Sequence, residues 1–200
     1  MAQAAKTRRP PQAKSARGRT RRDMILTAAA QLFHRHGFHD TGIDDIGAAV
    51  GITGPGVYRH FESKQDLLGA IIEQSLEQHQ QIVDEVKDSR LPPREALTKL
   101  VAMSAQALVA NRERGAIYFR ESGNLTPDKY TRFVRVQRGL IAEWVQMVRA
   151  ARPDLGEEEA RVEVRAVSGL LNSVGLFTTR LSSEQLAERL TQMALRAVLP

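Results

Sequence analysis

The chain has no cysteine, few aromatic residues and no long hydrophobic run, and each of these absences excludes a class of protein. Without cysteine it can form no disulfide, thiolate zinc site, iron–sulfur cluster or cysteine nucleophile, which fits a reducing compartment. Aromatic residues make up 5% of the 200 positions, so the core is expected to be mainly aliphatic. No stretch of about 18 apolar residues occurs, so we expect no membrane partner.

Catalytic and metal-binding patterns are missing as well. The sequence contains no serine-hydrolase elbow, no phosphate-binding loop and no zinc-protease helix motif. Its one histidine cluster, His34, His36 and His39, has spacings of two and three that suit shared metal ligation poorly. We therefore expect no enzyme activity, no metal site and no cofactor.

Positive charge is concentrated at the N-terminus. Residues 1–22 contain eight Lys and Arg residues and no acidic residue, whereas the whole chain carries a net charge of +6, so the remainder is slightly acidic. Residues 1–20 also lack hydrophobic periodicity, and we expect them to form a disordered basic arm that meets a polyanion such as DNA. A solvated leader without a partner is the alternative.

The rest of the chain shows helical periodicity and no alternating strand pattern. Apolar residues recur at spacings of three and four from Arg21 onward. The fold class predicted is all-α, with about nine helices. The penultimate of these helices is expected to run from Glu157 to about Arg180.

Residues 41–68 carry the most informative pattern. Two short apolar-periodic segments meet at Gly51, and Ser63 is placed to cap the helix that follows, as in a helix-turn-helix. Such a motif presents the first half of its second helix to base edges in the major groove. Arg59 could contact guanine or clamp a phosphate, and Tyr58 could contact a phosphate or be a half-buried core residue. The candidate DNA contacts are Arg19, Arg21, Arg22, Thr41, Thr53, Gly54, Pro55, Gly56, Tyr58, Arg59, His60 and Lys64.

The segment from Gly51 to Lys64 resembles the signature of the TetR/AcrR family of bacterial transcriptional regulators. The matching positions are Thr41, Ile46, Tyr58, His60, Phe61, Lys64 and Leu67, and Gly47 departs from the alanine usual there. The resemblance implies a three-helix helix-turn-helix DNA-binding domain, here over 21–67, followed by a six-helix effector-binding and dimerisation domain over 68–200. It also implies a homodimer on a pseudo-palindromic double-stranded DNA operator, usually a repressor released by a small-molecule effector. A cytoplasmic, nucleoid-associated location follows from that role.

One feature favours a rival interpretation, in which a helical ligand-binding protein has a helix-turn-helix that does not bind DNA. Residues 23–66 contain three Lys and Arg residues against six Asp and Glu residues, which is unfavourable next to a phosphate backbone. If DNA is bound, the arm is therefore expected to supply much of the electrostatic attraction.

The C-terminal half offers candidates for two further surfaces. The first is an effector pocket. Its lining is expected to be aliphatic with few charges, which suits an apolar or acyl-type ligand. The candidate pocket residues are Tyr118, Phe119, Glu121, Phe133, Arg138, Trp144, Asn172 and Phe177. The candidate dimer-interface residues, which could instead pack within one chain, are Val167, Leu170, Leu171, Val174, Leu186, Leu190 and Met193.

Overall fold

The computed structural model describes the backbone of residues 12–199 and the side chains of residues 21–118 and 120–199. Helices occupy most of this part of the chain and it contains no strand, so the all-α prediction is confirmed. Two short 3₁₀ turns, Ser122–Asn124 and Ser173–Gly175, interrupt the α-helices. The helices are α1 (Gln12–His36), α2 (Ile43–Ala49), α3 (Gly54–Tyr58), α4 (Lys64–Asp88), α5 (Pro93–Ala110), α6 (Arg112–Glu121), α7 (Pro127–Ala151), α8 (Glu157–Asn172) and α9 (Ser183–Val198).

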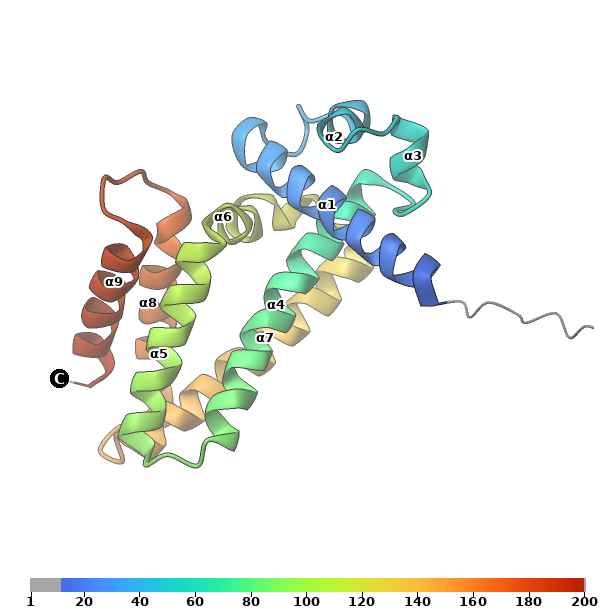
Figure 1. Cartoon of the computed structure of the whole chain (residues 1–200). Helices are drawn as coiled ribbons and strands as arrows, with labels where there is room; N and C mark the ends of the chain where they lie inside the picture. Colours follow the sequence, from blue (N-terminus) through green and yellow to red (C-terminus); the bar gives the residue numbers. More distant parts are fainter. Residues whose placement is uncertain (1–11, 200) are drawn as a thin grey trace, which may run out of the picture.

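The first three helices form a small unit at one end of the molecule (Figure 1). α2 and α3 pack against each other, and α1 packs on α2 and α4. The buried side chains of Phe33, Ile46, Val57 and Phe61 fill the space between them. This unit presents α3 at its outer side, away from the helices of the second half.

α1 begins at Gln12, before the start near Arg21 that the apolar periodicity predicts. The residues from Gln12 to Thr20 are Gln, Ala, Lys, Ser, Arg, Gly and Thr, most of them good helix formers, and they follow two prolines. Helix propensity therefore extends α1 where no core-facing pattern exists. The prediction of a disordered arm falls partly on residues 1–11, which lie outside the described residues, and the domain boundaries stay predictions.

α4 links the two halves of the chain. The Ser63 side chain caps it by accepting a hydrogen bond from the Asp66 N–H at 3.0 Å, as the sequence predicts. α4 packs on α1 at one end and on α5 and α7 along its length, so it belongs to both cores. Near its start, Asp66 forms an ion pair with Lys129 of α7. The hydrogen bond and charge of Lys129 lower the pKa of Asp66 although burial alone would raise it.

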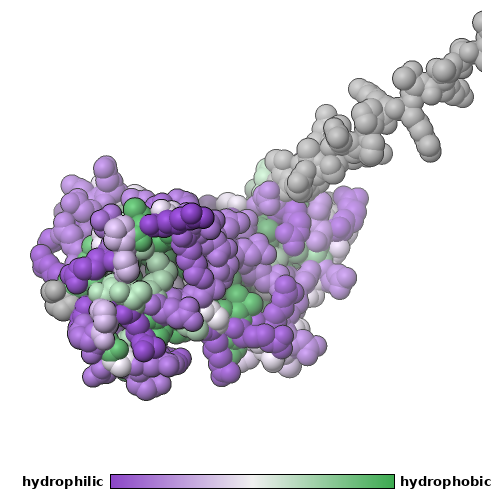
Figure 2. Space-filling view, turned by 90° about the horizontal axis from the view of Figure 1, so that it is seen from below, coloured by the Kyte–Doolittle hydropathy of each residue, from purple (hydrophilic) through white to green (hydrophobic). Residues whose placement is uncertain are grey.

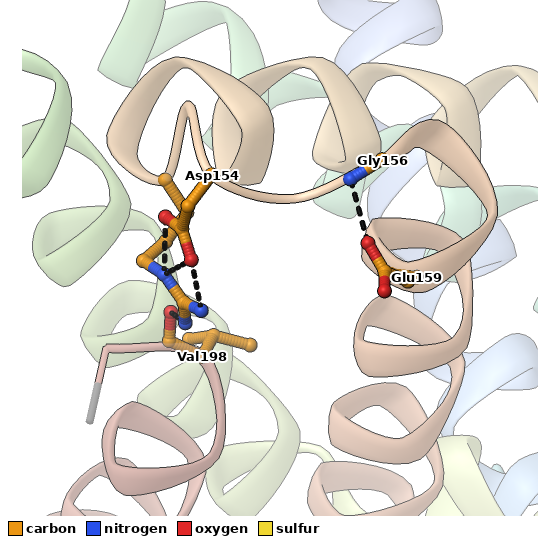
Figure 3. Close-up of polar contacts among 5 residues, drawn as sticks. Asp154, Gly156, Glu159 and Val198 are labelled. Carbon is orange, nitrogen blue, oxygen red and sulfur yellow. Dashed lines mark hydrogen bonds and ion pairs between the residues drawn. The ribbon is translucent and has the colours of Figure 1, made fainter.

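The far end of the helical bundle is held by polar contacts around the α7–α8 turn (Figure 3). The Arg152 guanidinium donates to the Asp154 carboxylate at 2.8 Å and to the Val198 carbonyl at 3.4 Å, which joins the turn to the end of α9. On the other side of the turn the Gly156 N–H donates to the Glu159 carboxylate at 2.8 Å, so a side chain of the first turn caps the start of α8.

α8 ends at Asn172, so the prediction that it continues to about Arg180 is wrong. The reason is the approach of the following 3₁₀ turn to α6. A Cβ on Gly175 would lie 2.7 Å from the Ala116 Cβ and 2.9 Å from the Arg112 carbonyl oxygen, so only glycine allows this contact. The chain then runs to α9, whose predicted capping box of Ser182 and Gln185 is confirmed.

Candidate DNA-binding face and effector cavity

The turn between α2 and α3 is unusually tight. Gly51 has a φ of +70°, and the Ile52 N–H donates to the Gly47 carbonyl at 2.9 Å. A Cβ on Gly47 would lie 2.7 Å from the Ile52 carbonyl oxygen and 3.0 Å from the Thr53 carbonyl carbon. Glycine at position 47 therefore lets the backbone of the turn come closer to α2 than an alanine would.

α3 exposes one polar face to solvent. Thr53, Pro55, Tyr58 and Arg59 are exposed and His60 is half-buried. Tyr58 is 53% exposed, so the alternative that it is a half-buried core tyrosine is wrong. Among the described residues, no side chain or backbone group forms a hydrogen bond or ion pair with the Arg59 guanidinium. This face offers a hydroxyl, a phenol and a free cation to a partner.

Three of the predicted contacts are placed inside the domain instead. Gly54 and Gly56 are buried against their own domain. A Cβ on Gly54 would meet Asp44, and a Cβ on Gly56 would meet Ile52. Their missing side chains allow α3 to pack on its own domain, not to approach a groove wall. Thr41 is 2% exposed, and its hydroxyl donates to the Gly37 carbonyl at 2.8 Å.

Lys64 is likewise occupied within the chain. Its Nζ donates to the Thr41 carbonyl at 2.9 Å and to the His39 carbonyl at 3.2 Å. The same ammonium lies 4.6 Å from the centre of the Phe38 ring. The α1–α2 loop is thus tied to the start of α4, and this geometry does not favour the predicted contact of Lys64 with DNA.

The arginines at the start of the described side chains also make internal contacts. Arg21 donates to the Val50 carbonyl at 2.9 Å, which satisfies a free carbonyl at the end of α2. The Arg22 guanidinium lies over the Phe61 ring, 4.6 Å from its centre. Arg19, the third arginine predicted to contact DNA, has a side chain outside the described residues.

α6 joins this domain to the second half of the chain through one arginine. The Arg114 guanidinium donates to the Gln74 side-chain oxygen at 2.9 Å and to the Thr27 hydroxyl at 3.1 Å. Gln74 lies on α4 and Thr27 on α1. At the start of α6, the Asn111 amide donates to Gln78 of α4 at 3.4 Å. A shift of α6 therefore acts directly on the helix that carries the DNA-binding domain.

A cavity of about 120 Å³ lies among α4, α5, α6, α7 and α8. Apolar groups form most of its wall, as is usual for ligand sites. The lining residues are Ser75, Leu76, Gln78, His79, Ser104, Ala107, Leu108, Asn111, Gly115, Tyr118, Gln137, Leu140, Ile141, Trp144, Val164, Ser168, Leu171 and Asn172.

The polar groups in this wall are neutral. Burial lowers the pKa of His79, and a hydrogen bond from its Nδ1 to the Ser75 carbonyl, at 2.8 Å, opposes that effect only in part. Because a carbonyl only accepts, this bond places the proton on Nδ1 and leaves Nε2 as an acceptor. Burial raises the pKa of the Tyr118 phenol far above its ordinary value, so this group stays protonated.

Comparison with known proteins identifies the architecture. The family model of bacterial regulatory proteins of the tetR family matches residues 25–71, and the model of a Tetracyclin repressor-like C-terminal domain matches residues 90–198. The HTH-type transcriptional repressor KstR2 of Rhodococcus jostii is 30% identical over 173 residues, which are 86% of this chain and 84% of the relative. The chain belongs to the TetR family of bacterial regulatory proteins.

Two solved structures share the fold of this TetR-family regulator. The ketosteroid transcriptional regulator KstR2 of Mycobacterium tuberculosis has a TM-score of 0.76 at 24% identity, covering 90% of this chain and 93% of that one. AibR, solved with isovaleryl coenzyme A and operator DNA, has a TM-score of 0.74 at 22% identity, covering 86% and 97%. The regulator is therefore a DNA-binding transcriptional regulator, in a family whose member KstR2 of Rhodococcus jostii is a repressor, and it is not an enzyme.

The predicted effector-pocket residues are brought together only in part. Tyr118, Trp144 and Asn172 line the cavity. Phe133 packs edge-on against Tyr118, with 5.0 Å between ring centres, and borders a second cavity of about 180 Å³ between α4 and α7. The sequence offered no signal for His79, which lies in a polar run, or for Ser104, which lies among apolar residues, because both look like ordinary helix positions.

The other predicted pocket residues lie elsewhere. Glu121 is buried at the end of α6, near Gly37, and accepts a hydrogen bond from Asn124 at 2.9 Å, so it belongs to the contact between the two halves. Arg138 is on the exposed side of α7, and Phe177 is 44% exposed in the link before α9. The side chain of Phe119 is outside the described residues.

Most of the predicted dimer-interface residues are buried within one chain of the regulator. Val167, Leu171, Val174, Leu186 and Leu190 belong to its own core, because α8 packs on α7, α9 packs on α5, and the 3₁₀ turn that carries Val174 packs on α6. Of the remaining two predicted residues, Leu170 is half-buried and Met193 is exposed. The alternative that the stripes pack within one chain is therefore correct for those five residues.

The regulator's described residues contain neither a membrane-spanning helix nor a cluster of metal ligands. None of its helices between Gln12 and Val198 is long and apolar enough to cross a bilayer. In the same part of the chain, no group of three or more His, Asp or Glu side chains is arranged to hold a metal ion.

Proposed function

We propose that the regulator contacts its operator through the exposed face of α3, with Thr53, Tyr58, Arg59 and His60 as the contacting side chains. The observation that carries this proposal is the free guanidinium of Arg59 beside an exposed phenol on the outer side of the motif. The start of the second helix is the part of such a motif that reaches base edges; Thr53 lies there, whereas Tyr58 and Arg59 lie one turn further along, at the end of α3. Arg59 to guanine and Arg59 to phosphate remain the two modes that this geometry allows.

The electrostatics of binding depend on the arm. Lys64, Arg21 and Arg22 are engaged within the chain, so few cations of residues 21–66 are left for phosphates. Six Lys and Arg residues precede Arg21 in the sequence. Deleting residues 1–11, which contain Lys6, Arg8 and Arg9, is expected to weaken DNA binding and to flatten its dependence on salt by about one log–log unit for each lost phosphate contact. An unchanged slope would contradict this role.

We infer that the dimer uses the exposed apolar residues of α8, α9 and the link between them. Val162, Leu176, Phe177 and Met193 are between 44% and 65% exposed. Figure 2 shows only small hydrophobic patches on the mainly hydrophilic face seen from below. An interface between two copies buries such residues symmetrically. Replacing Val162 and Phe177 by aspartate should give a folded monomer by light scattering, whereas Leu91→Asp on the α4–α5 turn should stay dimeric.

The effector site that we propose is the cavity among α4, α5, α7 and α8. Its apolar wall suits an apolar or acyl-type ligand, and the ketosteroid and isovaleryl coenzyme A in the names of the two solved relatives are compatible with that class. A ligand that changes the packing of α6 would act on Arg114 and hence on α1 and α4. Release of the protein from its operator then follows from the difference between the ligand's affinities for the two arrangements of α6, before and after this change in packing.

The direct test is binding of the full-length protein to the DNA upstream of its own coding region, measured by fluorescence anisotropy. The double variant Tyr58→Ala/Arg59→Ala should lose at least tenfold in affinity while keeping the thermal midpoint of the parent. Arg35→Ala, which removes an exposed cation of α1 outside the proposed face, is the matched control and should bind normally. Equal affinity of the double variant and the parent would refute the proposal. We propose that the protein acts in the cytoplasm, at the nucleoid, because the operator DNA is there.

A further inference from the structure

We propose that the part of the effector enclosed by the cavity is an uncharged, ring-sized group that carries a carbonyl or ether oxygen, and that this oxygen accepts a hydrogen bond from the Ser104 hydroxyl. This inference rests on the proposed function of the cavity as the effector site. It specifies the chemical class of the ligand and the residue that selects it.

Ser104 is the only lining side chain whose buried polar atom has no partner among the described residues. It is 1% exposed, and its Oγ forms no hydrogen bond. Other hydroxyls on helices of this chain donate to the carbonyl four residues earlier, as Ser75 does to Ile71 at 3.2 Å and Thr191 does to Ala187 at 2.7 Å. A buried donor is costly to leave unpaired, and native structures rarely do so without a functional reason.

A ligand oxygen is the partner that the wall suggests. Ser104 lies on α5 in the cavity lining, among Ala107, Leu108 and residues of the facing helices. An acceptor on a ligand would satisfy the hydroxyl without any change in the protein. A pure hydrocarbon would leave it unpaired, so the site favours an oxygen-bearing ligand over its hydrocarbon counterpart.

The wall excludes a charged group from the enclosed part. None of the described residues that line this cavity is Lys, Arg, Asp or Glu. A carboxylate or phosphate would lose its hydration there without gaining a cation. His79 does not supply a cation. Its Nδ1–H donates a hydrogen bond to the Ser75 carbonyl, and its other nitrogen is an acceptor. Burial also keeps the pKa of this imidazole low.

The size of the cavity limits the enclosed group to about one ring. Its volume of about 120 Å³ is slightly below the ~150 Å³ of an apolar cavity known to hold benzene. Any longer or charged portion of the effector must extend beyond the lining residues.

The test uses three six-membered probes of one shape, namely cyclohexanone, cyclohexane and cyclohexanecarboxylate. Occupancy is read from the fluorescence of Trp144, which lines the cavity and is the one tryptophan of the chain. Cyclohexanone and cyclohexane should both bind the full-length protein, and the carboxylate should bind at least 30-fold more weakly than the ketone. A carboxylate that binds as tightly as the ketone would overturn the exclusion of charge.

Ser104→Ala tests the hydrogen bond. It should weaken cyclohexanone binding by about 2- to 10-fold, the range of a net neutral hydrogen bond, and should leave cyclohexane binding unchanged. Ser75→Ala is the matched control, because Ser75 lines the same cavity with its hydroxyl already donated to Ile71. An equal loss in both variants, or no loss in Ser104→Ala, would refute the role of Ser104. The comparison of the three probes on the parent protein does not depend on either variant folding.

Failure of this inference is distinguishable from failure of the proposed function. A charged effector that displaces operator DNA and changes Trp144 fluorescence would overturn the ligand class and leave the cavity as the effector site. Ring probes that show the expected selectivity support the ligand class, whether or not they displace DNA. DNA displacement without any Trp144 response would instead move the effector site away from the cavity and overturn both.

Discussion

Replacing Lys64 by methionine separates a structural role from a DNA contact. The side chain keeps its length and loses its charge. Two hydrogen bonds to the Thr41 and His39 carbonyls and the contact with the Phe38 ring disappear. Hydrogen bonds to charged groups contribute about 1.5–3 kcal/mol each and exposed cation–π contacts about 0.5–1 kcal/mol.

Lys64 is half-buried, so water recovers part of this energy, and we expect a net loss of about 2 kcal/mol. For a chain of this size that corresponds to a fall of about 4–8 °C in the thermal midpoint. Differential scanning calorimetry measures it directly. Lys99→Met is the matched control, because Lys99 pairs with Glu85 on the surface at 3.2 Å and should cost less than about 1 kcal/mol.

The dependence of DNA binding on salt decides between the two roles of Lys64. If the two carbonyls hold the Lys64 ammonium, Lys64→Met lowers DNA affinity by the same factor at every salt concentration. The log–log slope of affinity against salt is then that of the parent. A phosphate contact would reduce the slope by about one. The reasoning is refuted if Lys64→Met has the same thermal midpoint as the parent and the slope of its DNA affinity against salt is smaller by one.

Three further predictions follow from the same structure. Gly47→Ala should destabilise the helix-turn-helix by about 1–3 kcal/mol and weaken DNA binding, because the new Cβ meets backbone atoms of Ile52 and Thr53, whereas Gly139→Ala on exposed α7 should be neutral or stabilising; equal melting of the two variants would contradict this. The low pKa of His79 means that the unfolded state binds the proton more readily, so stability should fall as pH drops below about 6.5, and His79→Gln should flatten the curve of thermal midpoint against pH; identical curves would argue against it. Arg114→Leu should leave the Trp144 response to effector intact and reduce the effector's influence on DNA affinity at least threefold; full release at the parent's effector concentration would exclude Arg114 as the link.

The helices were predictable from the sequence because their boundaries are encoded locally. Ser63, Ser182 and Pro127 begin α4, α9 and α7 where capping rules place them. The two misplaced boundaries have other causes. The early start of α1 reflects propensity without an apolar face, and the early end of α8 reflects the packing of Gly175 against α6, which no local pattern records.

The site was predictable only as far as exposure can be inferred from a motif. The exposed positions of Thr53, Tyr58 and Arg59 follow from the helix-turn-helix pattern. The capture of Lys64 by two carbonyls depends on where the α1–α2 loop lies in space, and periodicity along the chain does not contain that information. The same holds for Ser104 and His79, whose role depends on the helices that face them across the cavity.

One side chain of α4 borders both cavities. Leu76 lines both the 120 Å³ cavity and the 180 Å³ cavity next to Phe133, Lys129 and Arg132. Shortening it would merge them into one chamber near the ~300 Å³ at which drug-sized pockets begin. The merged chamber would have a neutral inner end and an outer end bearing ionic side chains. A single substitution at Leu76 could therefore turn a sensor of small neutral rings into a sensor of longer amphiphiles. This gives such a repressor a short evolutionary path to new inducers.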